Sequence, residues 1–261
     1  MKRQARNTWL IARTILLEAV RRRELYVIVL IALALLAGLR FVTFFQIQGL
    51  SKFYREISLR TMNTATALVA ILLAARQLPR EFKNRTLYPL LAKPITRLEF
   101  ILGKFYGVLL ASAFCYLMFL VVFCVACISL KAPINYRLFA QGVYLEALCV
   151  AVVTAMTFLF SLLLNIDAAI TISTILFLFS QVMMNLLSFI YDQIGPLQQK
   201  IVLAMHYIIP QLTLFDLSGK ITHNIWGPIS ARAMGILSLY AVVYILIYMT
   251  ISYLLFRRRP I

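Results

Sequence analysis

The residues of this sequence best suited to chemistry are its four cysteines and two histidines. Cys124 and Cys127 have the CxxC spacing of zinc and redox sites, but no second cysteine pair and no histidine lies near them. Because all four cysteines fall in apolar stretches, we interpret them as small buried hydrophobic residues. His206 and His223 stand apart from any cluster of carboxylates, and we interpret each as a polar residue at an interface. We therefore expect no catalytic residue, metal site or bound cofactor in this chain.

Two acidic residues lie in or beside apolar stretches, where a charge is costly. Glu146 is close to the predicted outer end of its stretch, which favours a water-exposed or paired carboxylate over a proton relay. Asp167 belongs to a predicted tight turn at 165–167 and is placed to cap the next helix. The sequence contains no GxxxxGKS or GxxxxGKT phosphate-binding loop, so any ATP hydrolysis must come from another chain.

The composition is that of an integral membrane protein. Of the 261 residues, 62% are hydrophobic and 13% are charged, which is too apolar for a soluble domain. A net charge of +17 could indicate nucleic-acid binding in another setting, but here the basic residues cluster beside apolar stretches. Membrane lipids and membrane topology explain such clusters, and we expect no nucleic-acid partner.

The apolar stretches predict an all-α integral membrane protein, with six transmembrane helices in a single domain that covers residues 1–261. The spans are predicted at about 25–45, 58–75, 105–130, 138–163, 168–191 and 235–256. The outer segment 192–232 is interrupted by Gly and Pro, and it has an apolar stripe that predicts an amphipathic helix at the outer interface: Leu197, Ile201, Ala204, Met205 and Ile208. This segment could form an outer gate or only cover the top of the bundle.

An amphipathic helix is predicted for residues 1–24, because Ala12, Ile15 and Ala19 share one apolar face. A helix of this kind lies on the membrane surface. Most of the 26 Lys and Arg residues fall in 1–24, in the loop 76–104 and after the last span. The positive-inside rule therefore predicts that both termini are cytoplasmic.

The basic loop 76–104 contains signals for ordered structure. A short polar loop at 46–57 leads to the second span, and after that span Pro79 fits the first turn of a short helix. Glu81 and Arg85 are four residues apart and can pair on one face of this helix. Prolines at positions 89 and 94 end the helix and stiffen the turn that follows.

The end of the loop predicts how the next helix begins. Thr96 and Glu99 have the spacing of a capping box. Gly103 and Gly107 follow on the same helix, four residues apart, and this spacing lets a neighbouring helix approach closely.

The order of these parts, a charged short helix followed by LLAKPITR and EFILGKF, resembles the permease subunits of type-2 ABC exporters. In such permeases the loop between the second and third spans carries a coupling helix that docks into a groove of the ATPase subunit. By this resemblance, the ATPase-docking positions are Arg80, Glu81, Phe82, Arg85 and Thr86. The segment 1–24 resembles the elbow helix of the family, and the stretch 207–217 resembles the short helices before its last span.

The resemblance implies a permease of the cytoplasmic (inner) membrane that exports a substrate by alternating access. Its expected partners are an ATP-binding cassette ATPase subunit, which binds the ATP, and a second permease copy in a homodimer or related heterodimer. The implied organisation is an elbow helix at 1–24, five spans within 25–191 with the coupling loop at 76–104, an outer segment at 192–232 and a last span at 235–256.

Two other interpretations stay open: a membrane scaffold or assembly factor without transport, and a secondary transporter. A secondary transporter needs ion-coupling groups near the midplane, and only Glu146 and Asp167 are available. The loop 76–104 could also be an ordinary positive-inside loop that contacts lipid headgroups. The spans are rich in Phe, Leu and Tyr and poor in charge, which favours an amphipathic or lipid-like cargo over a small ion.

Overall fold

The computed structural model describes residues 2–20, 50–83, 96–129, 135–190, 210–223 and 227–258, together with Tyr26, Leu30, Leu33, Ala34 and Gly195. Within these residues every regular element is a helix, as the sequence predicts. The elements are α1 (Lys2–Val20), α3 (Leu50–Lys83), α5 (Arg97–Ser129), α6 (Tyr136–Leu163), α7 (Ile166–Ile190), η3 (Leu212–Phe215), α9 (Ser218–His223) and α10 (Ala231–Arg258).

Four of the described helices are long and apolar enough to cross a bilayer: Arg55–Pro79, Arg97–Val125, Tyr136–Leu163 and Ala231–Arg258. At 1.5 Å per residue, the 28 residues of α6 extend about 42 Å, which exceeds the hydrocarbon core of a membrane. Helix α7 has 25 residues and includes the apolar stretch Ile166–Gln181. The predicted first span, 25–45, lies almost entirely outside the described residues, so the number of six spans stays a prediction.

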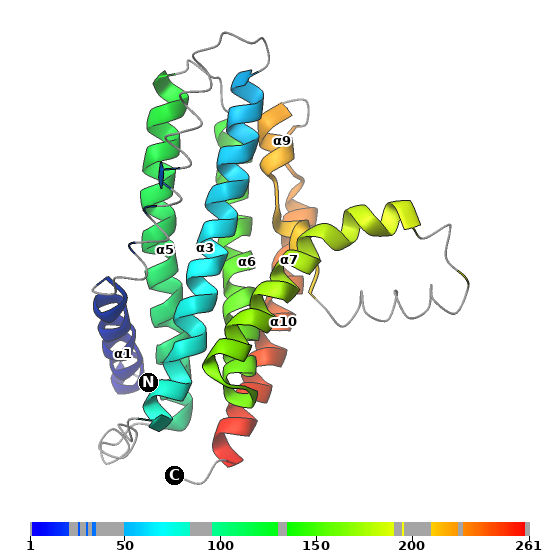
Figure 1. Ribbon diagram of the computed structural model, residues 1–261. Helices are drawn as coiled ribbons and strands as arrows, with labels where there is room; N and C mark the ends of the chain where they lie inside the picture. Colours follow the sequence, from blue (N-terminus) through cyan, green and yellow to red (C-terminus); the bar gives the residue numbers. More distant parts are fainter. Residues whose placement is uncertain are drawn as a thin grey trace.

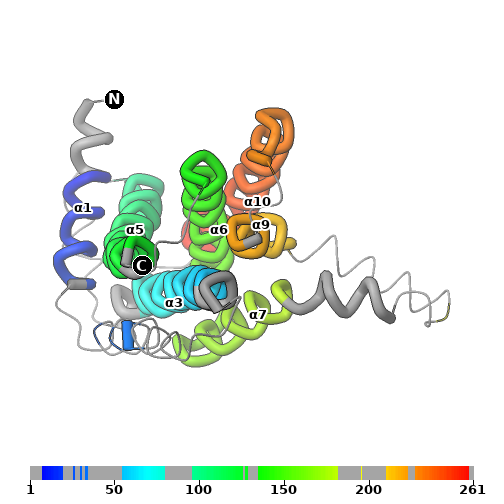
Figure 2. The backbone as a smooth tube through the Cα atoms, turned by 90° about the horizontal axis from the view of Figure 1, so that it is seen from above, coloured from blue at the N-terminus to red at the C-terminus, as the bar shows by residue number. Residues whose placement is uncertain are grey.

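The long helices form an elongated bundle in which α3 packs against α5, α6 and α7, while α10 packs against α6 (Figure 1). The end of α3, the start of α5 and the end of α10 lie together at one end of the bundle, which we call the Lys83 end. The opposite end carries α9. Helix α1 contacts α5 near the Lys83 end, and Figure 2 shows it along its length while α5 and α6 are seen nearly end-on. Helix α1 therefore lies across the bundle.

Helix α3 corrects two sequence predictions, because it is continuous for 34 residues from Leu50 to Lys83. It begins within the loop predicted at 46–57, and it contains Pro79 in its interior, where a separate short helix was predicted to start. A proline costs a helix one backbone hydrogen bond and some steric strain. Burial of α3 outweighs this cost: Leu59 near its start and Leu78 beside the proline are 3% and 0% exposed.

The start of α5 confirms the predicted capping box. The backbone N–H of Glu99 donates to Thr96 Oγ1 at 3.2 Å, and the backbone N–H of Thr96 donates to Glu99 Oε2 at 3.4 Å. These reciprocal bonds satisfy backbone donors that have no partner in the first turn of a helix. The helix accordingly begins at Arg97, directly after the predicted cap.

The segment 210–223 covers the end of the bundle opposite Lys83. Its apolar side chains are almost completely buried: Leu212, Phe215, Leu217 and Ile221. Ser180 on α7 fixes the segment, because its hydroxyl donates to the carbonyl of Pro210 at 2.9 Å and accepts the N–H of Leu212 at 2.8 Å. The apolar stripe predicted for the outer segment, from Leu197 to Ile208, lies outside the described residues.

Helix α10 is joined to α6 near the same end. The amide of Gln141 donates to the carbonyl of Ile229 at 3.0 Å and accepts its N–H at 2.9 Å. Tyr144 and Ser238 share a second hydrogen bond of 2.9 Å. The rest of α10 is mostly exposed, with only Ala241, Met249, Ser252 and Phe256 buried.

Candidate functional site

Three of the five predicted docking positions lie at the Lys83 end of the bundle. Arg80, Glu81 and Phe82 belong to the last turn of α3 and therefore continue the helix that crosses the bundle. Arg85 and Thr86 lie outside the described residues, and so does the predicted pairing of Arg85 with Glu81. The role of these five residues stays a prediction.

Gly103 and Gly107 lie on the face of α5 that contacts α1. A Cβ atom on Gly103 would be 2.9 Å from Ile11 Cβ, and one on Gly107 would be 2.8 Å from Ile15 Cβ and 3.1 Å from Ala12 Cα. Ordinary carbon contacts are roughly 3.5–4.0 Å, so only glycine permits this separation of the two helices. The neighbouring helix is therefore the N-terminal one, which the sequence pattern alone did not identify.

Two basic residues join three helices at the Lys83 end. Arg97 at the start of α5 donates from Nη1 to the carbonyls of Arg257 at 2.8 Å and Phe256 at 3.4 Å. These carbonyls belong to the last turn of α10, where a positive charge is favourable. Lys104, which is 7% exposed, donates from Nζ to Gln77 Oε1 on α3 at 3.0 Å. The two helices on either side of the loop are thus joined to each other near this end, and the start of α5 is joined to the end of α10.

Glu146 occupies the other polar region, and its surroundings contradict the sequence prediction. Its side chain is 3% exposed, and its Oε1 has no hydrogen-bond partner among the residues that the structure describes. The expectation of a water-exposed carboxylate is therefore wrong, while the alternative of a paired carboxylate stays a prediction. The physical reason is that η3 and α9 cover this end of α6, so that position 146 lies deeper than its distance from the end of the helix suggests.

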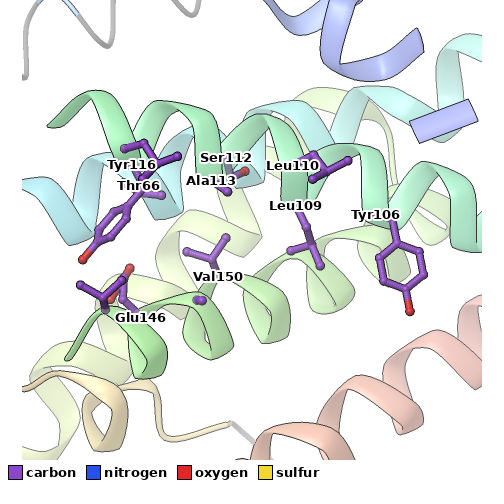
Figure 3. Close-up of a pocket in the computed structure, with 12 residues that line it drawn as sticks. Thr66, Tyr106, Leu109, Leu110, Ser112, Ala113, Tyr116, Glu146 and Val150 are labelled. Atoms are coloured by element: carbon purple, nitrogen blue, oxygen red, sulfur yellow. The ribbon is translucent and has the colours of Figure 1, made fainter. Parts of the chain in front are cut away.

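A cavity of about 380 Å³ lies between α5 and α6, with Thr66 of α3 on its wall (Figure 3). Its lining is mainly apolar, and Glu146 lies at one end, towards which Tyr116 extends from α5. A second cavity, of about 250 Å³, lies on the other side of Glu146 and has a more polar lining that includes Arg60, Asn63, Gln181 and Asp216. Glu146 therefore separates an apolar cavity from a polar one.

Polar contacts connect the first half of α3 to α9 beside the second cavity. Arg55, which is 4% exposed, donates from Nη2 to the carbonyl of Thr222 at 3.1 Å. Asn63 donates from Nδ2 to Ser218 Oγ at 3.5 Å. Asp216 accepts the backbone N–H of Ser218 at 2.9 Å, which orders the start of α9. One helix, α3, therefore extends from the predicted docking positions to this polar region.

A model of a known protein family matches residues 9–260, and it describes the ABC-2 family transporter proteins. The chain belongs to the ABC-2 transporter family. The match includes the N-terminal helix, the loop between α3 and α5 and the last helix, so the permease assignment applies to the whole domain. No curated protein matches the chain. An ABC-2 permease is a membrane transport component and not a catalyst by itself, and its family implies association with an ABC ATPase.

In this permease, sequence reasoning missed several residues that the fold brings together. Arg55 was assigned to a loop, yet it is buried and bound to α9. Glu146 was identified from the sequence as an acid in an apolar helix, but its burial under η3 and α9 was not predicted. Gln141 and Arg97 bind backbone carbonyls of residues that are far away in the sequence. No pattern in the neighbouring sequence predicts such contacts.

Proposed function

We propose that this chain is the transmembrane subunit of an ATP-driven exporter of the cytoplasmic membrane. In this proposal it works with a second permease copy and with ATPase subunits that bind and hydrolyse the ATP, and it exports by alternating access. The family match over residues 9–260 is the observation that supports the proposal most strongly. The geometry of α3 supports the coupling of this chain to an ATPase.

Helix α3 could carry motion from an ATPase into the bundle. Its 34 residues extend about 51 Å at 1.5 Å per residue. Arg80, Glu81 and Phe82 lie at one end, and the contacts of Arg55 and Asn63 with α9 lie towards the other. Because the helix is unbroken, a displacement of its docking end must also displace or strain its contacts with α9. This supports the assignment of the docking residues to a coupling element.

The contacts at the Lys83 end would define which helices move together. Arg97 links α5 to α10, and Lys104 links α5 to α3. A force on α3 would therefore reach α5 and α10 without passing through the centre of the bundle. In an alternating-access cycle this end of α3, α5 and α10 would move together, and the packing of α3 and α10 against α6 would carry the motion further into the bundle.

The orientation of the bundle in the membrane is supported by the distribution of its basic residues. Arg257 and Arg258 end α10 at the same end of the bundle as the docking positions, and the basic N-terminal helix lies there too. The positive-inside rule therefore supports a cytoplasmic Lys83 end, where an ATPase would have access to the loop 76–104.

The first test is purification of the tagged full-length chain from its native membrane. We expect a stoichiometric ATPase with a phosphate-binding loop to co-purify, while the chain separated from that subunit hydrolyses no ATP. Reconstituted vesicles should then move cargo only with ATP. A complex that hydrolyses ATP and moves nothing would favour a scaffold, and transport that needs an ion gradient and no ATPase would favour a secondary transporter.

A further inference from the structure

The coupling proposal leaves the carboxyl group of Glu146 unexplained. It is buried in α6, its Oε1 lacks a hydrogen bond within the described part of the chain, and it faces both cavities. Burial of an acceptor without a partner opposes folding, and burial of an unpaired charge opposes it more strongly. A group retained under this penalty needs a partner from outside the described residues.

The charged side chains among the described lining residues do not supply that partner. Arg60 lines the polar cavity, but its guanidinium binds Glu56 at 2.9 Å and its side chain is 59% exposed. Asp216 adds a second acidic group and accepts hydrogen bonds from Ser218. Among the described lining residues, the two cavities therefore have two acidic groups and one basic group, Arg60, which is held by Glu56. This balance favours a positively charged or hydrogen-bond-donating ligand.

The apolar cavity indicates what the rest of the ligand would be. Leu109 and Leu117 of α5 and Val150 of α6 line it, and Glu146 lies at one end. Tyr106 and Leu117 are 51% and 57% exposed, so the lining continues onto the outer surface of the bundle between α5 and α6. In a membrane, an apolar molecule could reach the cavity from the side without first crossing an aqueous phase.

We propose that this cavity binds an amphipathic molecule with an ammonium group, which contacts Glu146 while the apolar part fills the space between α5 and α6. The polar cavity beyond Glu146 would accept the ammonium group on its way towards α9. The role of this molecule as cargo rests on the proposed function, but its binding requires no ATPase and is tested on the permease alone.

The probe is dansylcadaverine, which joins an apolar aromatic group to a primary ammonium. Its matched control is N-butyl dansylamide, which has the same aromatic group and no ammonium. Binding is measured by equilibrium dialysis of the full-length chain in dodecyl maltoside micelles, with protein-free micelles subtracted. We expect saturable binding of dansylcadaverine and weakening of it by about tenfold or more in Glu146→Gln, because an ionic hydrogen bond is lost. Asp167→Asn makes the same change at an exposed position and should leave binding unchanged.

A second variant protects the test against misfolding of Glu146→Gln. Ala113 lines the cavity from its exposed edge, so Ala113→Leu fills the space without a buried clash. It should weaken binding of both dansyl probes, while its melting temperature stays equal to that of the parent protein.

Phosphatidylethanolamine added as a competitor identifies the source of the ammonium group: displacement of the probe indicates a lipid headgroup, and no displacement indicates a separate amine cargo. Equal affinity of the parent for the two probes, or unchanged affinity in both variants, would overturn the proposal.

Discussion

The contact between α1 and α5 allows a quantitative test through Gly107→Ala. The new methyl group would lie 2.6 Å from Ile15 Cδ1, 2.8 Å from Ile15 Cβ and 3.1 Å from Ala12 Cα. The Cδ1 atom can rotate away, but Ile15 Cβ and Ala12 Cα move only with the backbone of α1. Restoring normal contact distances requires α1 to move by roughly half an ångström or more. Overpacking of this kind costs about 1–3 kcal/mol.

The same substitution also has a favourable effect, because alanine stabilises a helix relative to glycine by about 1 kcal/mol. Gly235→Ala provides the matched control: Gly235 lies in α10, and a Cβ atom there would meet nothing within 4 Å. We expect Gly107→Ala to unfold at lower SDS content than Gly235→Ala in mixed micelles, with a free energy of unfolding lower by about 1–3 kcal/mol. If the two variants are equally stable, α1 does not pack this closely against α5, and the proposed placement of the N-terminal helix fails.

Three further predictions concern coupling, topology and packing. Arg85→Glu should abolish ATP-dependent export while the protein stays folded and inserted, because loss of a charge pair at a docked interface costs about 2–5 kcal/mol. The control is Arg232→Glu, at an exposed position at the start of α10, and this variant should export normally. Normal export by both variants would refute the docking assignment. In a cysteine-free variant, single cysteines at positions 79 and 200 should differ in their reaction with a membrane-impermeant thiol reagent, and only position 200 should react from outside. Labelling of position 79 from outside would contradict the predicted orientation. Gln141→Ala should lower the free energy of unfolding by about 1–3 kcal/mol, because two hydrogen bonds to Ile229 are lost. A variant as stable as the parent protein would show that these hydrogen bonds do not hold α10 in place.

Local structure, such as a helix cap or the buried face of a helix, was predictable from the sequence wherever a few neighbouring residues determine it. Thr96 and Glu99 form the predicted capping box, because both partners lie within one turn. Ala12, Ile15 and Ala19 are buried on one face of α1, as their helical spacing predicts. Each of these predictions depends on the geometry of a single helix, which the sequence specifies directly.

The errors arise where distant parts of the chain decide the outcome. Pro79 was predicted to begin a helix, but packing of the surrounding residues of α3 keeps that helix continuous. Glu146 was predicted to meet water or a partner, because its depth was judged from the length of its own span. Its burial depends on residues 212–223, which return to cover α6 about seventy positions later in the sequence. No pattern local to position 146 contains that information.

The polar contacts at the two ends of α10 also have a consequence for biosynthesis. This helix is the last of the described elements to be translated, and between its ends it packs half-buried side chains such as Tyr240 and Tyr248 against the core. Until it arrives, the guanidinium of Arg97 lacks the carbonyls of Phe256 and Arg257, and the amide of Gln141 lacks Ile229. Before α10 arrives, these polar groups at the two ends of the bundle are hydrated by water. Insertion of α10 replaces this water at both ends with hydrogen bonds to the chain, and so fixes the last helix to α5 and α6 in one step.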